Sequence, residues 1–179
     1  EDALERGAQV IALGRNLTAL DLLKQKGATT LQADLSDGDA RKALWRDLSR
    51  YQATVNRVVY AAGIAVRGTA KEMEPDELRT MFEVNTLAAL ELIGWSSGLA
   101  SGSILTLLSS NLAQHPLSHT VGYSASKAAV EAACRSAAGT LGRSGIRINA
   151  IAPGPVDTPM LRGQFETKEA AEAGLTGLG

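Results

Sequence analysis

The chain has 179 residues, which is enough for one globular domain with a substantial buried core. Apolar residues make up 45% and charged residues 21% of the chain, and this balance argues against disorder. Its 18 Lys and Arg are matched by 19 Asp and Glu, so we expect a small-molecule partner rather than nucleic acid. One Cys and two His argue against a disulfide scaffold and a zinc site. We therefore expect no bound metal. No run of about 18 apolar residues occurs, so we expect a cytoplasmic protein with no membrane contact.

Short apolar runs alternate along the chain with segments of helical periodicity, an order typical of a parallel sheet with helices on its faces. Strands are expected, in chain order, at residues 9–13, 29–33, 58–61, 103–108 and 146–151. Helices are expected at residues 17–26 after a cap at Asn16, 37–48 after a cap at Ser36, 75–99 and 123–141. The sequence therefore predicts one α/β domain over residues 1–179 with a doubly wound parallel sheet. Its third strand, which is apolar throughout, is expected to be buried on both faces.

The beginning of the chain suggests that this domain is partial. Residues 2–6 resemble the end of a helix and lead straight into a strand, and no glycine-rich phosphate turn follows any early strand. We therefore expect the whole protein to continue beyond both given ends and to carry a phosphate-binding turn upstream.

The fourth predicted helix begins with a candidate acid-base pair. Tyr123 and Lys127 are four residues apart, so their side chains share one face of a helix, and an ammonium beside a phenol favours the phenolate. Chance spacing is the alternative explanation. Ser110 follows the fourth strand and Pro153 follows the fifth. Because ligands bind at the carboxyl edge of an open parallel sheet, we expect these groups to face one crevice.

Six motifs in this order resemble the short-chain dehydrogenase/reductase family. They are Asp34-Leu35, Tyr60-Ala61-Ala62-Gly63, Val84-Asn85, Leu107-Leu108-Ser109-Ser110, Tyr123-Ser124-Ala125-Ser126-Lys127 and Pro153-Gly154-Pro155-Val156-Asp157-Thr158. The resemblance covers nearly the whole chain and implies a Rossmann-like fold. It also implies hydride transfer between NADP(H) or NAD(H) and a ketone or secondary alcohol. Tyr60 and Ala61 stand where the family commonly has asparagines.

The resemblance also implies a role for each of four catalytic residues. Tyr123 is expected to protonate the substrate carbonyl oxygen, or to accept the proton in the oxidative direction, while Ser110 binds the same oxygen. Lys127 is expected to lower the pKa of Tyr123 and to bind the nicotinamide ribose. Asn85 is expected to hold a water that relays protons to Lys127. A backbone-capping Ser110 and a merely solvated Asn85 are the alternatives.

The residues after the first two strands bear on the choice of cofactor. Gly14 is followed by Arg15, which leaves room and charge for a 2′-phosphate and favours NADP(H) over NAD(H). Asp34 is expected to meet the adenine amine, with Leu35 nearby. A solvated Arg15 and a helix-capping Asp34 are the alternatives. The other cofactor contacts that the resemblance implies are Ala62, Gly63, Tyr123, Lys127, Pro153, Gly154, Val156 and Thr158.

Two further expectations concern partners and alternative functions. Family members commonly associate through the helices expected at residues 75–99 and 123–141, so we expect a homodimer or homotetramer, with plain intramolecular packing as the alternative. A non-catalytic relative that senses a nucleotide or acts as a scaffold is the alternative function. Within enzymes, a sugar-nucleotide epimerase shares the Tyr-Lys pair.

Overall fold

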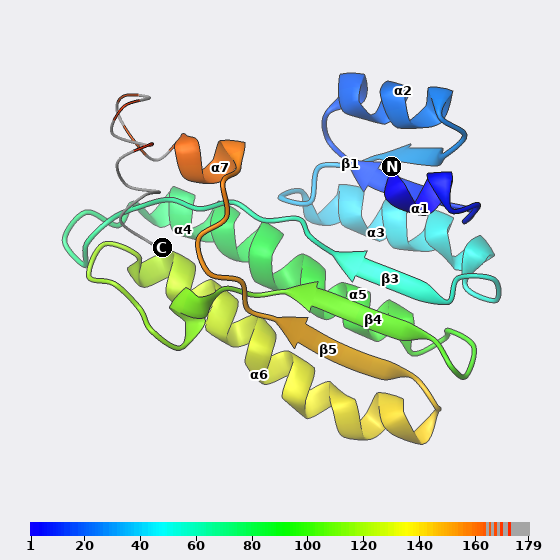
Figure 1. Cartoon of the computed structure of the whole chain (residues 1–179). Coiled ribbons are helices and arrows are strands. Elements are labelled where there is room, and N and C mark those ends of the chain that lie inside the picture. Colours follow the sequence, from blue (N-terminus) through cyan, green and yellow to red (C-terminus); the bar gives the residue numbers. More distant parts are fainter. Residues whose placement is uncertain (164, 166, 168, 170–171, 173–179) are drawn as a thin grey trace. The chain divides into compact units, whose positions relative to one another are not determined.

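The computed structural model describes residues 1–163, 165, 167, 169 and 172 (Figure 1). The chain divides into two compact units, Glu1–Tyr51 and Gln52–Gly179, and each contains its own parallel sheet. All five predicted strands are present, each within two residues of the expected bounds. They are β1 (Ile11–Gly14), β2 (Thr29–Gln32), β3 (Arg57–Tyr60), β4 (Ile104–Leu108) and β5 (Arg147–Ile151).

The first unit is a strand–helix–strand arrangement with a further helix. Its helical elements are α1 (Asp2–Glu5), α2 (Leu17–Gln25), α3 (Gly38–Leu48) and the 3-10 helix η1 (Ser49–Tyr51). β1 and β2 pair in parallel, with Ile11 opposite Thr29, and α2 packs against both strands. The predicted cap of α2 is confirmed, because the Asn16 side chain accepts a hydrogen bond of 3.1 Å from the Ala19 amide.

The predicted cap of α3 is wrong by one residue. Asp37, not Ser36, caps the helix, and its Oδ1 accepts from the Asp39 amide at 2.8 Å and the Ala40 amide at 3.3 Å. The Ser36 hydroxyl instead donates to Asp34 Oδ1 at 2.7 Å. Two adjacent residues compete for one cap position, and the hydrogen bond to Asp34 removes Ser36 from that competition.

The second unit holds three parallel strands in the order β3-β4-β5. Its helical elements are α4 (Pro75–Phe82), the π-helix η2 (Glu83–Leu87), α5 (Ala88–Ser96), the 3-10 helix η3 (Asn111–Ala113), α6 (Val121–Arg143) and α7 (Pro159–Arg162). α5 packs against β4 and α6 against β5, and Figure 1 shows these helices on one side of the sheet. The helix predicted from residue 123 is confirmed and starts two residues earlier.

The two faces of this sheet differ in burial. Leu105 and Leu107 of β4 have no exposed surface and lie on the same face as the buried Tyr60. On the opposite face Val59 is 66% exposed and Ile151 is 52% exposed. The expectation that the third strand is buried on both faces is therefore wrong. Side chains alternate along a strand, and the described helices that pack on β4 and β5 cover only the other face.

The long helix expected at residues 75–99 is interrupted. A π-helix from Glu83 to Leu87 separates α4 from α5. Short π-helical turns inside α-helices are frequent at functional sites. This one carries Asn85, which has no exposed surface, and the Tyr60 hydroxyl at the end of β3 donates to the Val84 carbonyl. The widened turn thus brings Asn85 to the end of a strand.

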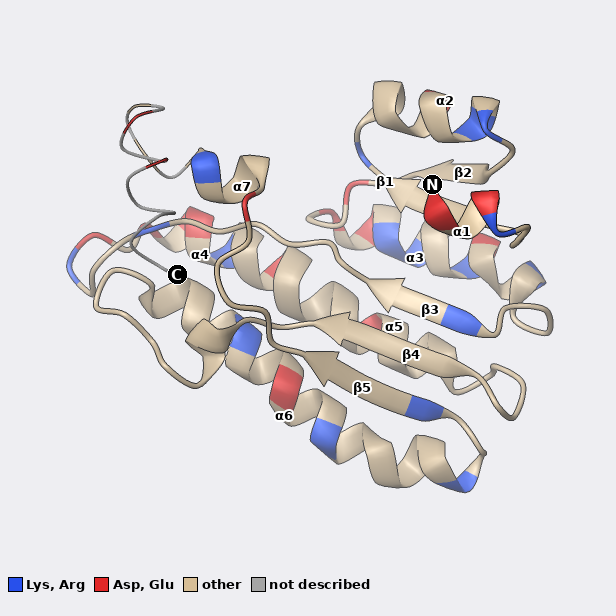
Figure 2. Cartoon of the chain, in the orientation of Figure 1, with Lys and Arg blue, Asp and Glu red and all other residues tan. Residues whose placement is uncertain are grey.

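Charged residues are spread over helices and loops, whereas the strands of the second unit carry few (Figure 2). β4 has none, and β3 and β5 each have one arginine, at their first residue. The carboxyl edge of this sheet therefore receives no charge from its own strands. Among the helices that the structure describes, none is both long and apolar enough to cross a membrane.

Candidate active site

The carboxyl end of β4 and the first turns of α6 meet at one place. The Nζ of Lys127 donates a hydrogen bond of 2.8 Å to the carbonyl of Leu108, the last residue of β4. Beyond β4, the Ser109 amide donates to the Ile151 carbonyl at 2.7 Å, so the end of β5 lies alongside. The sequence predicted that strand ends converge near Tyr123 and Lys127, and the second unit brings them together.

Tyr123 is partly buried next to Ser110. Burial raises the pKa of its phenol, because it penalises the charged phenolate, and a hydrogen bond with Ser110 opposes this by lowering the pKa. Burial outweighs the hydrogen bond, so the phenol keeps its proton over a wide pH range. A net lowering of the Tyr123 pKa by Lys127 was expected, and the structure shows the opposite direction. The hydroxyl is therefore set up as a proton donor.

Lys127 is a buried cation at this edge of the sheet. Only 5% of the residue is exposed, and burial lowers the pKa of its ammonium to about 8. Its Nζ lies 5.8 Å from the centre of the Tyr123 ring. A lysine with this pKa is charged at neutral pH and can release its proton when the pH is slightly above neutral. Lys127 can therefore exchange protons under ordinary conditions.

Asn85 holds the turn that follows β3. Its Oδ1 accepts from the Ile64 amide at 2.8 Å, and its Nδ2 donates to the Ile64 carbonyl at 2.9 Å and to Ser126 Oγ at 2.9 Å. Both amide hydrogens are thus used within the protein. The side chain fixes the backbone beside Gly63, and the water relay expected at Asn85 stays a prediction.

Gly63 lies where a side chain would crowd the site. A Cβ there would be 3.3 Å from Asn85 Oδ1 and 3.4 Å from Lys127 Nζ, which is tighter than usual packing. The backbone at Gly63 and the Lys127 ammonium therefore border a space that a side chain at this position would narrow. This cradle, with its cation beside a polar turn, fits the nicotinamide ribose that the resemblance implies.

The segment after β5 contributes the remaining predicted contacts of this unit. The Pro153 carbonyl accepts from the Asn111 amide at 2.9 Å, which holds the segment beside the end of β4. Gly154 borders open space, and Val156 is exposed. Thr158 caps α7, because its Oγ1 accepts a hydrogen bond from the Leu161 amide. Ala62 is half-buried in the turn after β3.

The first unit brings together the residues predicted to hold the adenosine part of the cofactor. Arg15 follows β1 and is exposed, and Asp34 lies two residues beyond β2. Hydrogen bonds from the amide and hydroxyl of Ser36 lower the pKa of Asp34, and the charge of Arg15 lowers it further. The Leu35 carbonyl accepts from Arg41 Nη1 at 2.6 Å. Arg15 and Asp34 therefore act on one another at the carboxyl edge of this sheet.

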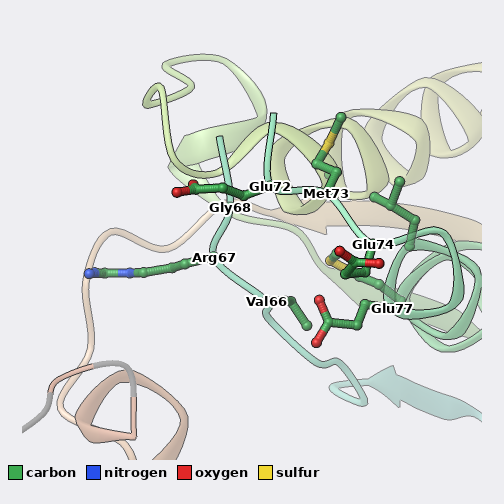
Figure 3. Close-up of a pocket in the computed structure, with 10 residues that line it drawn as sticks. Val66, Arg67, Gly68, Glu72, Met73, Glu74 and Glu77 are labelled. Carbon is green, nitrogen blue, oxygen red and sulfur yellow. The ribbon is translucent and has the colours of Figure 1, made fainter. Parts of the chain in front are cut away.

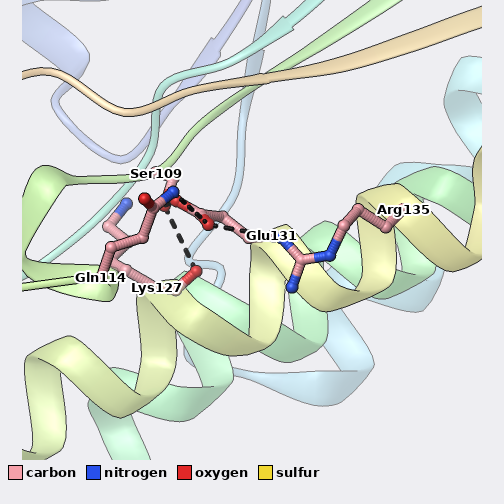
Figure 4. Close-up of polar contacts among 5 residues, drawn as sticks. All are labelled: Ser109, Gln114, Lys127, Glu131 and Arg135. Carbon is pink, nitrogen blue, oxygen red and sulfur yellow. Dashed lines mark hydrogen bonds and ion pairs between the residues drawn. The ribbon is translucent and has the colours of Figure 1, made fainter.

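Sequence reasoning missed a polar cluster beside these residues. Glu131 on α6 receives hydrogen bonds from Ser109 and Gln114, which lie on either side of Ser110 (Figure 4). The available signal was spacing, because Glu131 follows Lys127 by four residues just as Lys127 follows Tyr123. That spacing predicts a shared helix face, but not what the carboxylate contacts.

A separate hollow lies between the β3–α4 loop and α4 (Figure 3). Its volume of about 10 Å³ is enough for roughly one water. Glu74 and Glu77 lie at its edge together with Leu78 and Met81, and it includes none of the four predicted catalytic residues. This hollow is too small for a substrate.

A sequence profile described as enoyl-(acyl carrier protein) reductase matches residues 1–176. The chain belongs to the short-chain dehydrogenase/reductase family. This membership confirms the resemblance found in the six motifs. Relatives of this chain are named as dehydrogenases and reductases, and one structural neighbour holds bound NADP, which places the Ser110, Tyr123 and Lys127 group in an oxidoreductase family.

Three similar proteins illustrate this short-chain dehydrogenase/reductase relationship. The cyclic-di-GMP-binding biofilm dispersal mediator protein of Escherichia coli is 32% identical over 81% of this chain and 60% of its own length. The cis-4-hydroxycyclohexanecarboxylate dehydrogenase of Sinomonas cyclohexanicum is 32% identical over 89% of this chain and 68% of its own. A solved structure of a candidate dehydrogenase from Burkholderia cenocepacia with bound NADP is 27% identical, with a TM-score of 0.82, covering 98% of this chain and 70% of that one. The likeness confirms the α/β, Rossmann-like fold class, and this chain spans less than the full length of each relative.

Proposed function

We propose that residues 1–179 form the NADP(H)-binding part of an oxidoreductase that transfers hydride between NADP(H) and a ketone or secondary alcohol. The observation that carries this proposal is the group at the end of β4. A phenol that keeps its proton, Tyr123, lies beside Ser110 and shares its helix face with the buried Lys127. A dehydrogenase relative acting on a cyclic alcohol and an NADP-bound structural neighbour support the same substrate class and cofactor.

The residues can carry out the protonation half of carbonyl reduction. NADPH, when bound, supplies the hydride to the carbonyl carbon. The Tyr123 hydroxyl donates its proton to the carbonyl oxygen, and the Ser110 hydroxyl donates a hydrogen bond to the same oxygen as negative charge develops there. Lys127, with a pKa of about 8, is protonated at neutral pH and returns a proton to Tyr123. In the oxidative direction the same protons move in reverse.

Steady-state turnover by the whole protein tests this function. NADPH oxidation is followed by absorbance with a panel of ketones that runs from cyclohexanone to 3-oxoacyl thioesters and quinones. Substrate-dependent loss of NADPH, and reduction of NADP⁺ by the matching alcohol, would support the proposal. NADPH binding without turnover of any member of the panel would contradict it.

A nucleotide-sensing role is the second candidate, and one relative favours it. The E. coli protein that shares 32% identity is named for binding cyclic-di-GMP. A sensor needs no proton donor, so it would bind nucleotide with equal affinity after Tyr123→Phe. Calorimetric titration of the whole protein with cyclic-di-GMP and with NADPH distinguishes the two functions: the sensor binds cyclic-di-GMP and reduces no ketone.

Arg15 is proposed to select NADPH by pairing with its 2′-phosphate. The arginine is exposed directly after β1, where no carboxylate side chain precedes it in the strand. We expect Arg15→Ala to weaken NADPH binding by about tenfold to a hundredfold and to leave NADH binding unchanged, because a charge-assisted pair is worth about 1.5–3 kcal/mol. Fluorescence titration with both nucleotides measures this. Arg46→Ala, in the last turn of α3, is the matched control, and equal losses for both nucleotides would refute the assignment.

A homodimer or homotetramer is proposed from the apolar outer surface of α5 and α6. Leu90 on α5 is 43% exposed, and a groove of about 520 Å³ beside α6 is lined by Leu117, Val121, Ala125 and Ala128 among others. We expect Leu90→Glu to weaken self-association by about tenfold or more, because it places a charge in an apolar contact. Light scattering over a concentration series measures it. Leu22→Glu, at an exposed leucine of α2, is the control, and a wild-type monomer at every concentration would rule the assembly out.

A further inference from the structure

Glu131 is a buried carboxylate in the middle of the helix that carries Tyr123 and Lys127. Its side chain is only 8% exposed, whereas the neighbouring Arg135 is 70% exposed. Carboxylates are rarely buried unless hydrogen bonds or opposite charges compensate for the lost hydration. The Arg135 guanidinium is 3.5 Å from Glu131 Oε2, a long contact for an ion pair. Compensation must therefore come chiefly from other groups.

Those groups are two uncharged donors outside the helix. Glu131 Oε1 accepts a hydrogen bond of 2.9 Å from Ser109 Oγ, and Oε2 accepts one of 3.1 Å from Gln114 Nε2 (Figure 4). Hydrogen bonds to a charged acceptor are roughly twice as strong as neutral ones. Each oxygen thus anchors a different point of the chain to α6.

The two anchored points bracket Ser110. Ser109 directly follows β4 and is also held by its backbone, because its amide donates to the Ile151 carbonyl. Gln114 follows η3, the short turn that Ser110 begins by accepting a hydrogen bond from the Leu112 amide at 3.2 Å. A segment fixed at both ends to one carboxylate has little freedom to shift relative to α6.

The structure assigns Glu131 the role of a positioning residue: its carboxylate holds the turn that carries Ser110 at a fixed place relative to Tyr123 and Lys127. The assignment rests on the proposed oxidoreductase function, in which Ser110 and Tyr123 must reach the same carbonyl oxygen. Displacement of a catalytic group by about 1 Å can lower a rate by about a hundredfold. Glu131 itself touches neither substrate nor cofactor in this role.

A double-mutant cycle with Ser110 tests the assignment in the whole protein. The rate of NADPH-dependent reduction is measured for Glu131→Ala, Ser110→Ala and the double variant, using the ketone that the panel shows to be reduced fastest. We expect Glu131→Ala to lower kcat by about tenfold or more, with NADPH affinity within twofold of the wild-type value. In the Ser110→Ala background the same substitution should change kcat by less than twofold, because there is no longer a hydroxyl to position. Multiplicative losses would overturn the assignment.

Two further variants separate positioning from charge and from folding. Glu131→Gln keeps an acceptor for Ser109 and an amide that can pair with a rotated Gln114, so it should restore kcat to within about threefold of wild type. Arg135→Ala removes the weak ion pair and leaves both hydrogen bonds, and it should not change kcat. Loss of kcat in Arg135→Ala equal to that in Glu131→Ala would refute the hydrogen-bond role.

Amide hydrogen exchange provides a measurement that does not depend on turnover. In Glu131→Ala the Leu112 amide, which donates to Ser110 Oγ, should exchange about tenfold faster, while amides within β5 keep their wild-type rates. Unchanged exchange at Leu112 would overturn the assignment even if kcat falls. If Ser110→Ala alone leaves kcat intact, the role proposed for the Ser110 hydroxyl fails, and the exchange result still decides whether Glu131 fixes this turn.

Discussion

Tyr123→Phe in the whole protein is expected to lower kcat for ketone reduction by about a thousandfold, within the range of general acid catalysis. The substitution removes only the hydroxyl, so the aromatic ring keeps its position on α6. Burial holds the pKa of this phenol above its ordinary value, and so the hydroxyl is protonated throughout the neutral range. No other group in the proposed mechanism donates a proton directly to the carbonyl oxygen. The loss should therefore lie in kcat and not in NADPH binding.

Rapid-mixing kinetics of the variant measures kcat, and nucleotide titration of the same preparation measures its affinity for NADPH. Tyr51→Phe, at a half-buried tyrosine of the first unit, is the matched control and should keep wild-type kcat. A Tyr123→Phe enzyme that retains a tenth or more of wild-type kcat would show that another group protonates the substrate. A parallel loss of NADPH affinity would show that the hydroxyl acts chiefly in binding.

Local sequence signals predicted the elements of this fold well. The five strands lie within two residues of their expected bounds because each is a short run, mostly of apolar or β-branched residues, bounded by turn or helix-ending signals. The interruption of the long helix at Glu83–Leu87 could not be predicted in this way. This π-helical turn depends on contacts with distant parts of the chain. The Val84 carbonyl accepts a hydrogen bond from the Tyr60 hydroxyl, and the Asn85 side chain accepts one from the Ile64 amide.

The candidate site shows the same division between local and distant information. The four-residue spacing of Tyr123 and Lys127 predicted their shared helix face, and motif order predicted which strand ends would meet. The direction of the Tyr123 pKa was not predictable, because it depends on burial, which only the assembled structure reveals. Glu131 was missed for a related reason: its donors, Ser109 and Gln114, lie 22 and 17 residues away in sequence.

Burial of Lys127 has a cost in stability that can be measured through its pH dependence. The pKa of the folded group is lowered from 10.5 to about 8, which corresponds to about 3 kcal/mol between the two protonation states. Below pH 8 both folded and unfolded chains carry the proton, so the full penalty applies. Between about pH 8 and 10.5 the unfolded chain binds more protons than the folded one, so the free energy of unfolding must rise with pH.

Lys127→Met is therefore expected to raise stability while it removes activity. Methionine has a similar length and no charge to bury, and the loss of the hydrogen bond to the Leu108 carbonyl offsets about 1 kcal/mol of the gain. The net gain near pH 7 should be about 2 kcal/mol, and it should shrink as the pH rises towards 10.5. kcat should fall by about a hundredfold, because Tyr123 loses its proton source.

Urea unfolding of the whole protein near neutral pH and again near pH 10, with the exposed Lys71→Met as control, measures this dependence. The sign of the change in the free energy of unfolding distinguishes two roles for Lys127. A residue retained to stabilise the fold would make Lys127→Met less stable at every pH, whereas a residue retained for proton transfer makes the variant more stable, most of all below its folded pKa. A variant that is less stable near pH 7 would show that the ammonium is held by favourable interactions stronger than its desolvation, and would remove the basis for its lowered pKa.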